Sequence, residues 1–218
     1  MLGFINDYAL VIFRACILIA WFFVYSKGKF EPYNGYAIRM FLIFLAVISI
    51  SNGLMFLTAR SPLVYIFFWA LVMIFELFYI SSLLFKLARA RKKYSEIFII
   101  TLSVLAIPII LSAILTYTNH SWDPINTTDF YNQILLFIGS ILVIRSLLAQ
   151  DSFVDYIESF FIFAGFILYF GGTLLSTNPM VFNYLGNWGL GKFANFISLI
   201  FWLGSSFTVW KIRSRYSS

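Results

Sequence analysis

The chain has 218 residues, of which 61% are hydrophobic and only 11% are charged. A soluble globular domain carries roughly 25% charged residues, and a chain of this length has too little interior to hide so many apolar side chains. The composition excludes an ordinary soluble domain and predicts the lipid bilayer as a partner of most of the chain. The net charge of +6 does not indicate nucleic-acid binding, because the basic residues cluster at the ends of apolar stretches, where they direct membrane insertion.

Seven apolar stretches follow one another, each close to the roughly 20 residues that a helix needs to cross the bilayer. Arg14 interrupts the first apolar stretch, and the residues at 21–25 are bulky where cleavage of a signal peptide would need small ones. We therefore expect this stretch to be a retained helix and not a cleaved signal peptide. Pro62 suits the first turn of the third helix. We predict an all-α fold, a single transmembrane domain over residues 1–218, with seven helices at about 4–25, 37–57, 62–87, 96–117, 129–148, 153–175 and 193–212.

Polar and turn-forming residues separate these stretches, and the two longest predicted outer loops cover residues 118–128 and 176–192. The first of these loops contains two matches to the N-glycosylation acceptor pattern, which begin at Asn119 and Asn126. The matches have a consequence only in a host that glycosylates its secreted proteins.

Lysine and arginine residues fall at alternating ends of the predicted helices. With the C-terminus inside, two of them, Arg60 and Lys192, lie outside, and twelve lie on the cytoplasmic side. The twelve are Lys27, Lys29, Arg39, Lys86, Arg89, Arg91, Lys92, Lys93, Arg145, Lys211, Arg213 and Arg215. Because short cytoplasmic loops are enriched in Lys and Arg, this split predicts an outer N-terminus, a cytoplasmic C-terminus and a multi-pass protein of the plasma membrane (the inner membrane in a bacterium).

Two charged residues lie deep in the membrane in this arrangement. Arg14 is about ten residues inside the outer end of the first helix, and Glu76 is about fourteen residues into the third. A lone charge at that depth costs at least about 2.5–3.5 kcal/mol, so both side chains are expected to face the bundle and to pair. Asn52 of the second helix is a further candidate partner. Two interpretations remain open: a ligand site, proton site or switch, and a buried ion pair that only fixes helix packing.

Acidic and basic residues at the cytoplasmic side are candidates for docking a partner protein. Asp151, Asp155 and Glu158 share one face at the start of the sixth helix, although acids there also oppose the helix dipole or pair with Arg145 or with the basic run 86–93. That run sets topology and is free to contact anionic lipid or a partner. The candidate docking residues are Lys86, Arg89, Arg91, Lys92, Lys93, Asp155 and Glu158.

Motifs of the common membrane enzymes are missing from the sequence. The single histidine, His120, falls in a predicted loop, which excludes multi-histidine metal sites. There is no nucleophile-elbow motif and no phosphate-binding loop, and the last helix has no central lysine for a retinal Schiff base. We therefore expect no catalytic residue, no metal site and no cofactor.

The last third of the chain carries a family resemblance. Segments 158–173 (ESFFIFAGFILYFGGT) and 193–202 (FANFISLIFW) resemble small bacterial seven-helix integral membrane proteins that are similar to the membrane input regions of sensor histidine kinases. The resemblance implies a sensor- or receptor-like module without catalytic residues. Since these 218 residues hold no kinase domain, the signal would pass to a separate cytoplasmic or membrane partner. A transporter or channel for a small solute or ion is the alternative, and a lipid-modifying membrane enzyme ranks third.

Overall fold

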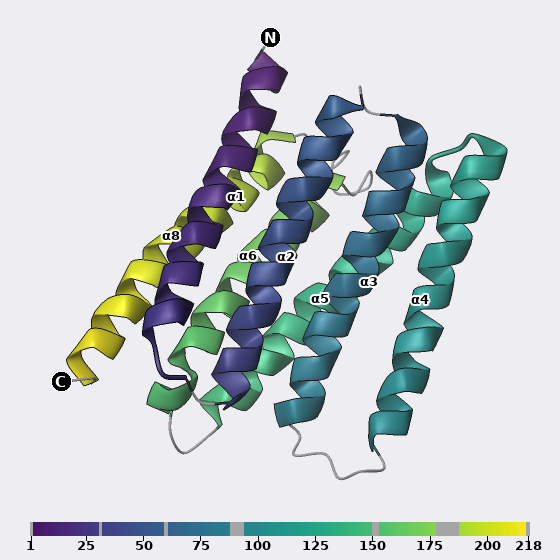
Figure 1. The fold of residues 1–218 in the computed structure, drawn as a ribbon. Coiled ribbons are helices and arrows are strands. Elements are labelled where there is room, and N and C mark those ends of the chain that lie inside the picture. Colours follow the sequence, from purple (N-terminus) through teal and green to yellow (C-terminus); the bar gives the residue numbers. More distant parts are fainter. Residues whose placement is uncertain are drawn as a thin grey trace.

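The computed structural model describes residues 2–30, 32–58, 61–87, 94–149, 153–177 and 188–216, and within these ranges every regular element is a helix (Figure 1). The elements are α1 (Leu2–Lys27), α2 (Pro32–Leu57), α3 (Pro62–Leu87), α4 (Tyr94–Asn119), α5 (Asp123–Leu148), the short 3-10 helix η1 (Phe153–Tyr156), α6 (Ile157–Thr177) and α8 (Trp188–Tyr216). The predicted all-α fold is confirmed for the described part of the chain.

Helix length and composition in the structure are those of a membrane protein. Each of the first five helices has 26 residues, which corresponds to about 39 Å of helix against a hydrocarbon core of about 30 Å. Five stretches are long and apolar enough to cross a membrane: Pro32–Ser51, Pro62–Lys86, Leu102–Asn119, Asp123–Leu148 and Ile157–Leu174. Their outward-facing side chains include exposed Phe67, Ile110 and Ile138, which fit a lipid environment and not water.

The observed helix ends differ most from the sequence prediction between α4 and α5. In place of a loop over residues 118–128, α4 continues to Asn119 and α5 begins at Asp123. His120 takes a positive φ of 52° in the tight turn between them, and the Ser121 hydroxyl accepts a hydrogen bond from the Asp123 backbone N–H at 3.3 Å. Asn126 is therefore exposed on the surface of α5 rather than in a loop.

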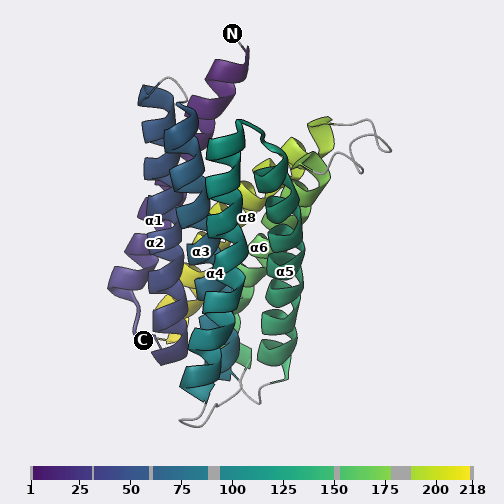
Figure 2. The same ribbon diagram turned by 90° about the vertical axis from the view of Figure 1, so that its right-hand side faces the viewer.

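The helices run up and down in turn, and each packs against its neighbour in the chain (Figure 1). Helix α8 closes the arrangement by packing on both α6 and α1, while α3–α5 and α2–α6 contacts fill the interior. Helix α4 lies at the outer edge, against α3 and α5 (Figure 2). The N- and C-termini lie at opposite ends of the bundle (Figure 1).

Trp202 of α8 is the centre of the described core. It is 1% exposed, and its indole nitrogen donates a hydrogen bond to the carbonyl of Ile162 at 3.0 Å. Its own carbonyl accepts a hydrogen bond from the Trp21 indole at 2.9 Å, and its ring lies 5.1 Å from the ring centroids of both Phe41 and Phe166. One residue thus connects α1, α2, α6 and α8 through its side chain and its carbonyl.

The indole of Trp202 approaches the helix α6 backbone at Gly165. A Cβ atom at this position would overlap the Trp202 ring, whereas a Cβ at Gly204 meets no atom within 4 Å. Gly165, and not Gly204, is therefore the glycine that permits close approach of α6 and α8.

We expect Gly165→Ala to destabilise the protein by about 1–3 kcal/mol, because an extra methyl group in a tightly packed core forces the neighbours apart. Gly204→Ala is the matched control and should leave stability unchanged or raise it slightly, since alanine favours helix. Thermal unfolding of both variants in the same detergent measures the difference. Equal unfolding temperatures would contradict this account of the core.

Candidate functional site

A partly open cavity of about 180 Å³ lies inside the bundle, with walls from α1, α2, α3 and α6. Its α3 wall begins at Tyr65, one turn from the start of that helix, so the cavity occupies the half of the bundle nearer the N-terminus. The guanidinium-bearing Arg14 of α1, Ser51 of α2 and the phenol-bearing Tyr169 of α6 line it together with aromatic and aliphatic side chains. A cavity of mixed polar and aromatic character inside a membrane bundle is suited to a small polar ligand.

Glu76 lies on the cavity-facing stripe of α3, one turn below Val72 and Met73. It is 1% exposed, and neither of its carboxylate oxygens has a hydrogen-bond partner among the described residues. Arg14 and Asp129 are charged groups that act on it electrostatically. The structure thus brings Arg14 and Glu76 into one region without the direct ion pair expected from the sequence, because α1 packs mainly on α2 and α8 rather than on α3.

Helix α5 adds a row of polar side chains that sequence reasoning did not include in the site. Asp129, Asn132 and Gln133 are spaced three and four residues apart, so they share one face of the helix. The Trp69 indole donates a hydrogen bond to the Asp129 carboxylate at 3.1 Å, and the Gln133 amide nitrogen lies 4.0 Å from the Met73 sulfur. The sequence predicts that the fifth helix begins at about Asp129, but α5 begins at Asp123, six residues earlier.

Unpartnered polar atoms gather on these facing helices. Besides the two oxygens of Glu76, the Gln133 amide oxygen and the Asn132 amide nitrogen have no hydrogen-bond partner in the described part of the protein. The third candidate from the sequence, Asn52, lies on α2, but its side chain falls outside the described residues. The adjacent Ser51 lines the cavity and donates its hydroxyl to the Val47 carbonyl at 2.7 Å.

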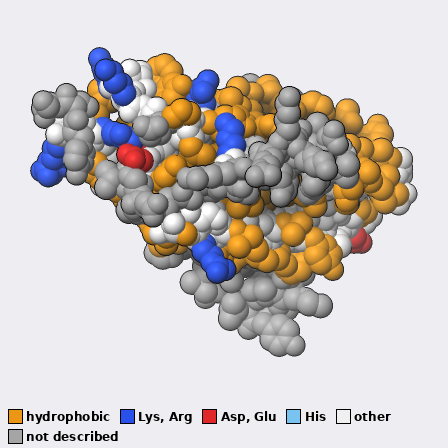
Figure 3. Space-filling model, turned by 90° about the horizontal axis from the view of Figure 1, so that it is seen from below, with side chains coloured by type: hydrophobic (Ala, Val, Ile, Leu, Met, Phe, Trp, Pro, Cys, Tyr) orange, Lys and Arg blue, Asp and Glu red, His pale blue; other side chains and the backbone are white. Residues whose placement is uncertain are grey.

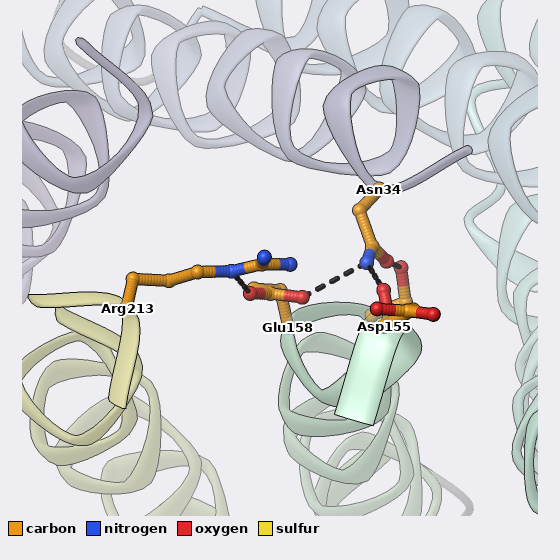
Figure 4. Close-up of polar contacts among 5 residues, drawn as sticks. Asn34, Asp155, Glu158 and Arg213 are labelled. Carbon is orange, nitrogen blue, oxygen red and sulfur yellow. Dashed lines mark hydrogen bonds and ion pairs between the residues drawn. The ribbon is translucent and has the colours of Figure 1, made fainter. Parts of the chain in front are cut away.

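A second polar cluster lies at the other end of the bundle, where α2, α6 and α8 meet (Figure 4). The Glu158 carboxylate is 0% exposed, pairs with the Arg213 guanidinium and accepts a hydrogen bond from the Asn34 amide at 2.8 Å. The same amide nitrogen donates to the Asp155 carbonyl, and the Ser159 hydroxyl donates to the Asn34 amide oxygen. This cluster satisfies a buried charge with partners from two other helices.

Glu158 was predicted to dock a partner protein, but in this cluster its side chain is buried. Its carboxylate points into the bundle and, among the described basic residues, pairs with Arg213 and not with Arg145 or Lys86, so it does not present a surface to a partner protein. Asp155 is half-buried. The physical reason is the rotation of α6, which turns Glu158 toward α2 and α8.

Basic side chains surround this same end of the bundle (Figure 3). Lys86 is exposed, and its ammonium group lies 3.3 Å from the centroid of the Tyr36 ring, a cation–π contact. The other docking candidates of the run, Arg89, Arg91, Lys92 and Lys93, lie outside the described residues. The described basic residues at this end are Lys27, Lys29, Arg39, Lys86, Arg145, Lys211, Arg213 and Arg215.

Comparison with known proteins found no matching family model, no matching curated protein and no matching solved structure.

We expect Arg213→Gln to lower the stability of the protein, because it leaves the buried Glu158 carboxylate without its cationic partner. Loss of one partner of a buried pair costs about 3–5 kcal/mol. Because the Arg213 side chain is 22% exposed, we expect the loss of stability to be at or below the lower end of this range. Lys211→Gln removes a positive charge from an exposed position on the same helix and should have little effect. Thermal unfolding in detergent compares the two, and an equal response would show that the pair does not stabilise the fold.

Proposed function

We propose that this chain is a non-enzymatic, sensor-like membrane protein that binds a small ligand in the cavity and signals through a separate partner protein. The observation that carries the proposal is the cavity with Arg14 on its wall and the buried, unpartnered carboxylate of Glu76 beneath it. Ionisable groups inside a membrane are costly and mark functional sites.

The same proposal includes seven crossings of the plasma membrane, with the N-terminus outside and the C-terminus in the cytoplasm. Two observations support this orientation. The termini lie at opposite ends of the bundle (Figure 1), and the end that holds the C-terminus carries the described basic side chains other than Arg14 (Figure 3). Cytoplasmic ends are the basic ones in membrane proteins, so the cavity lies in the outer half.

Helix α6 is the element that joins the cavity to the basic end. Tyr169 lines the cavity, and Glu158 on the same helix binds Arg213 of α8 and Asn34 of α2. The two α6 residues are separated by about 16 Å of helix. A ligand that displaces Tyr169 would therefore move the helix whose far end holds the second polar cluster.

A transporter for a small solute or ion is the second candidate. The unpartnered Glu76 carboxylate favours it, since buried acids serve ion-coupled transport. Many secondary transporters use interrupted helices at the substrate site, whereas each of α1–α5 is continuous, including α4 through Pro108. Helix continuity makes the sensor the better-supported function.

The orientation is tested with reporter fusions to the full chain in a bacterial inner membrane. A fluorescent protein at the C-terminus should fold and fluoresce, and alkaline phosphatase at the same position should be inactive, because phosphatase matures only outside the cytoplasm. The reverse result would overturn the orientation and, with it, the placement of the cavity in the outer half.

The sensor function is tested by two measurements on the full chain. Affinity capture from its own membranes should retain a signalling protein whose output changes with Glu76→Gln, because that substitution alters the cavity region and not the basic end. Asp123→Asn, an exposed acid at the start of α5, is the matched control and should leave the output unchanged. Solute flux through the purified chain in liposomes, without a retained partner, would overturn the sensor in favour of transport.

A further inference from the structure

We propose that the cavity binds a small zwitterion, a molecule with a carboxylate at one end and a primary ammonium group at the other. This inference rests on the proposed function, which makes the cavity a ligand site, and it assigns the chemical class of the ligand. Three features of the described residues carry it: the cation on the wall, the excess of hydrogen-bond acceptors beneath, and the volume.

The carboxylate end is recognised by Arg14. It is the charged side chain among the described residues that line the cavity, and a guanidinium holds a carboxylate through two parallel hydrogen bonds. Tyr65 of α3 and Tyr169 of α6 also line the cavity, and a phenol is a further O–H donor. A ligand without an anionic group would leave these donors facing an apolar or cationic surface.

The ammonium end is recognised by aromatic rings and by Glu76. Phe68 and Trp69 line the cavity beside Tyr65 and Tyr169, and rings of this kind attract a cation across their faces. One turn further along α3, both Glu76 oxygens lack a hydrogen-bond partner among the described residues. Glu76 is not among the residues that line the cavity and its oxygens are buried, so it favours the ammonium group through its charge from beneath the wall and not through a direct contact.

The charges of the region favour a ligand that carries both signs. Arg14 contributes one positive group, and Glu76 and Asp129 contribute two acidic groups that act on one another. A simple anion would add a negative charge beside two acids, and a simple cation would face the guanidinium on the wall. A zwitterion pairs each end with its complement and adds no net charge to the membrane interior, where net charge is costly.

The volume suits a ligand of a few atoms. The cavity measures about 180 Å³, the space of about six liquid waters at about 30 Å³ each. A short ω-amino acid such as 4-aminobutyrate is of this size, and its amine and its carboxylate lie at opposite ends of a flexible chain.

The test compares three probes of equal chain length on the full chain in nanodiscs: 4-aminobutyrate, butylamine and butyrate. Calorimetric titration should give 4-aminobutyrate an affinity at least tenfold above that of either single-charge probe. Arg14→Gln should reduce the affinity for 4-aminobutyrate to the affinity for butylamine. Glu76→Gln should reduce the affinity for 4-aminobutyrate to the affinity for butyrate. Arg145→Gln removes an exposed charge at the opposite end of the bundle from the cavity and should leave all three affinities unchanged.

Several results would overturn the proposal. If butylamine or butyrate binds as tightly as 4-aminobutyrate, the cavity is a cation site or an anion site. The proposal is also wrong if none of the ω-amino acids from glycine to 6-aminohexanoate binds. Arg14→Lys keeps the positive charge but loses the paired hydrogen bonds of the guanidinium. It should therefore keep a weaker preference for 4-aminobutyrate, which distinguishes lost recognition from lost folding. If the probes fail while Glu76→Gln still changes the output of the partner, the zwitterion is wrong and the sensor stands.

Discussion

Polar side chains inside this bundle must find their partners within the protein, because hydrocarbon offers none. At the basic end the buried Glu158 carboxylate has such partners, because Arg213 and Asn34 from two other helices hold it. In the half nearer the N-terminus the requirement is not met, since both oxygens of the buried Glu76 lack a partner among the described residues. This contrast separates a cluster that holds helices together from a region with unused binding capacity.

The aromatic core determines which helices share these two regions. Trp202 hydrogen-bonds to Ile162 and Trp21 and packs against Phe41 and Phe166, so α1, α2, α6 and α8 meet at one residue. Tight aromatic packing has few alternative arrangements, and it therefore fixes the rotation of α6. That rotation turns Glu158 toward α8 at one end and Tyr169 toward the cavity at the other.

The distribution of charge gives the bundle two chemically different ends. Basic side chains surround the end that holds the C-terminus, while the cavity lies toward the opposite end with the acids Glu76 and Asp129 close by. Helices of 26 residues run without interruption between them. A continuous helix transmits a displacement at one end to the other, which suits a module that detects a ligand on one side of a membrane and acts on the other.

The sequence by itself determined the features that depend on local composition: the helical class, the bounds 62–87 of α3, and the gathering of lysine and arginine at helix ends. It also singled out Arg14 and Glu76, because a charge in an apolar run is visible without any neighbour. Only the tertiary structure decided that Glu158 pairs with Arg213, 55 positions away, and that Asp129 belongs with Glu76. Those pairings depend on how each helix is rotated about its axis, and contacts such as Gly165 against Trp202, which no local pattern contains, set that rotation.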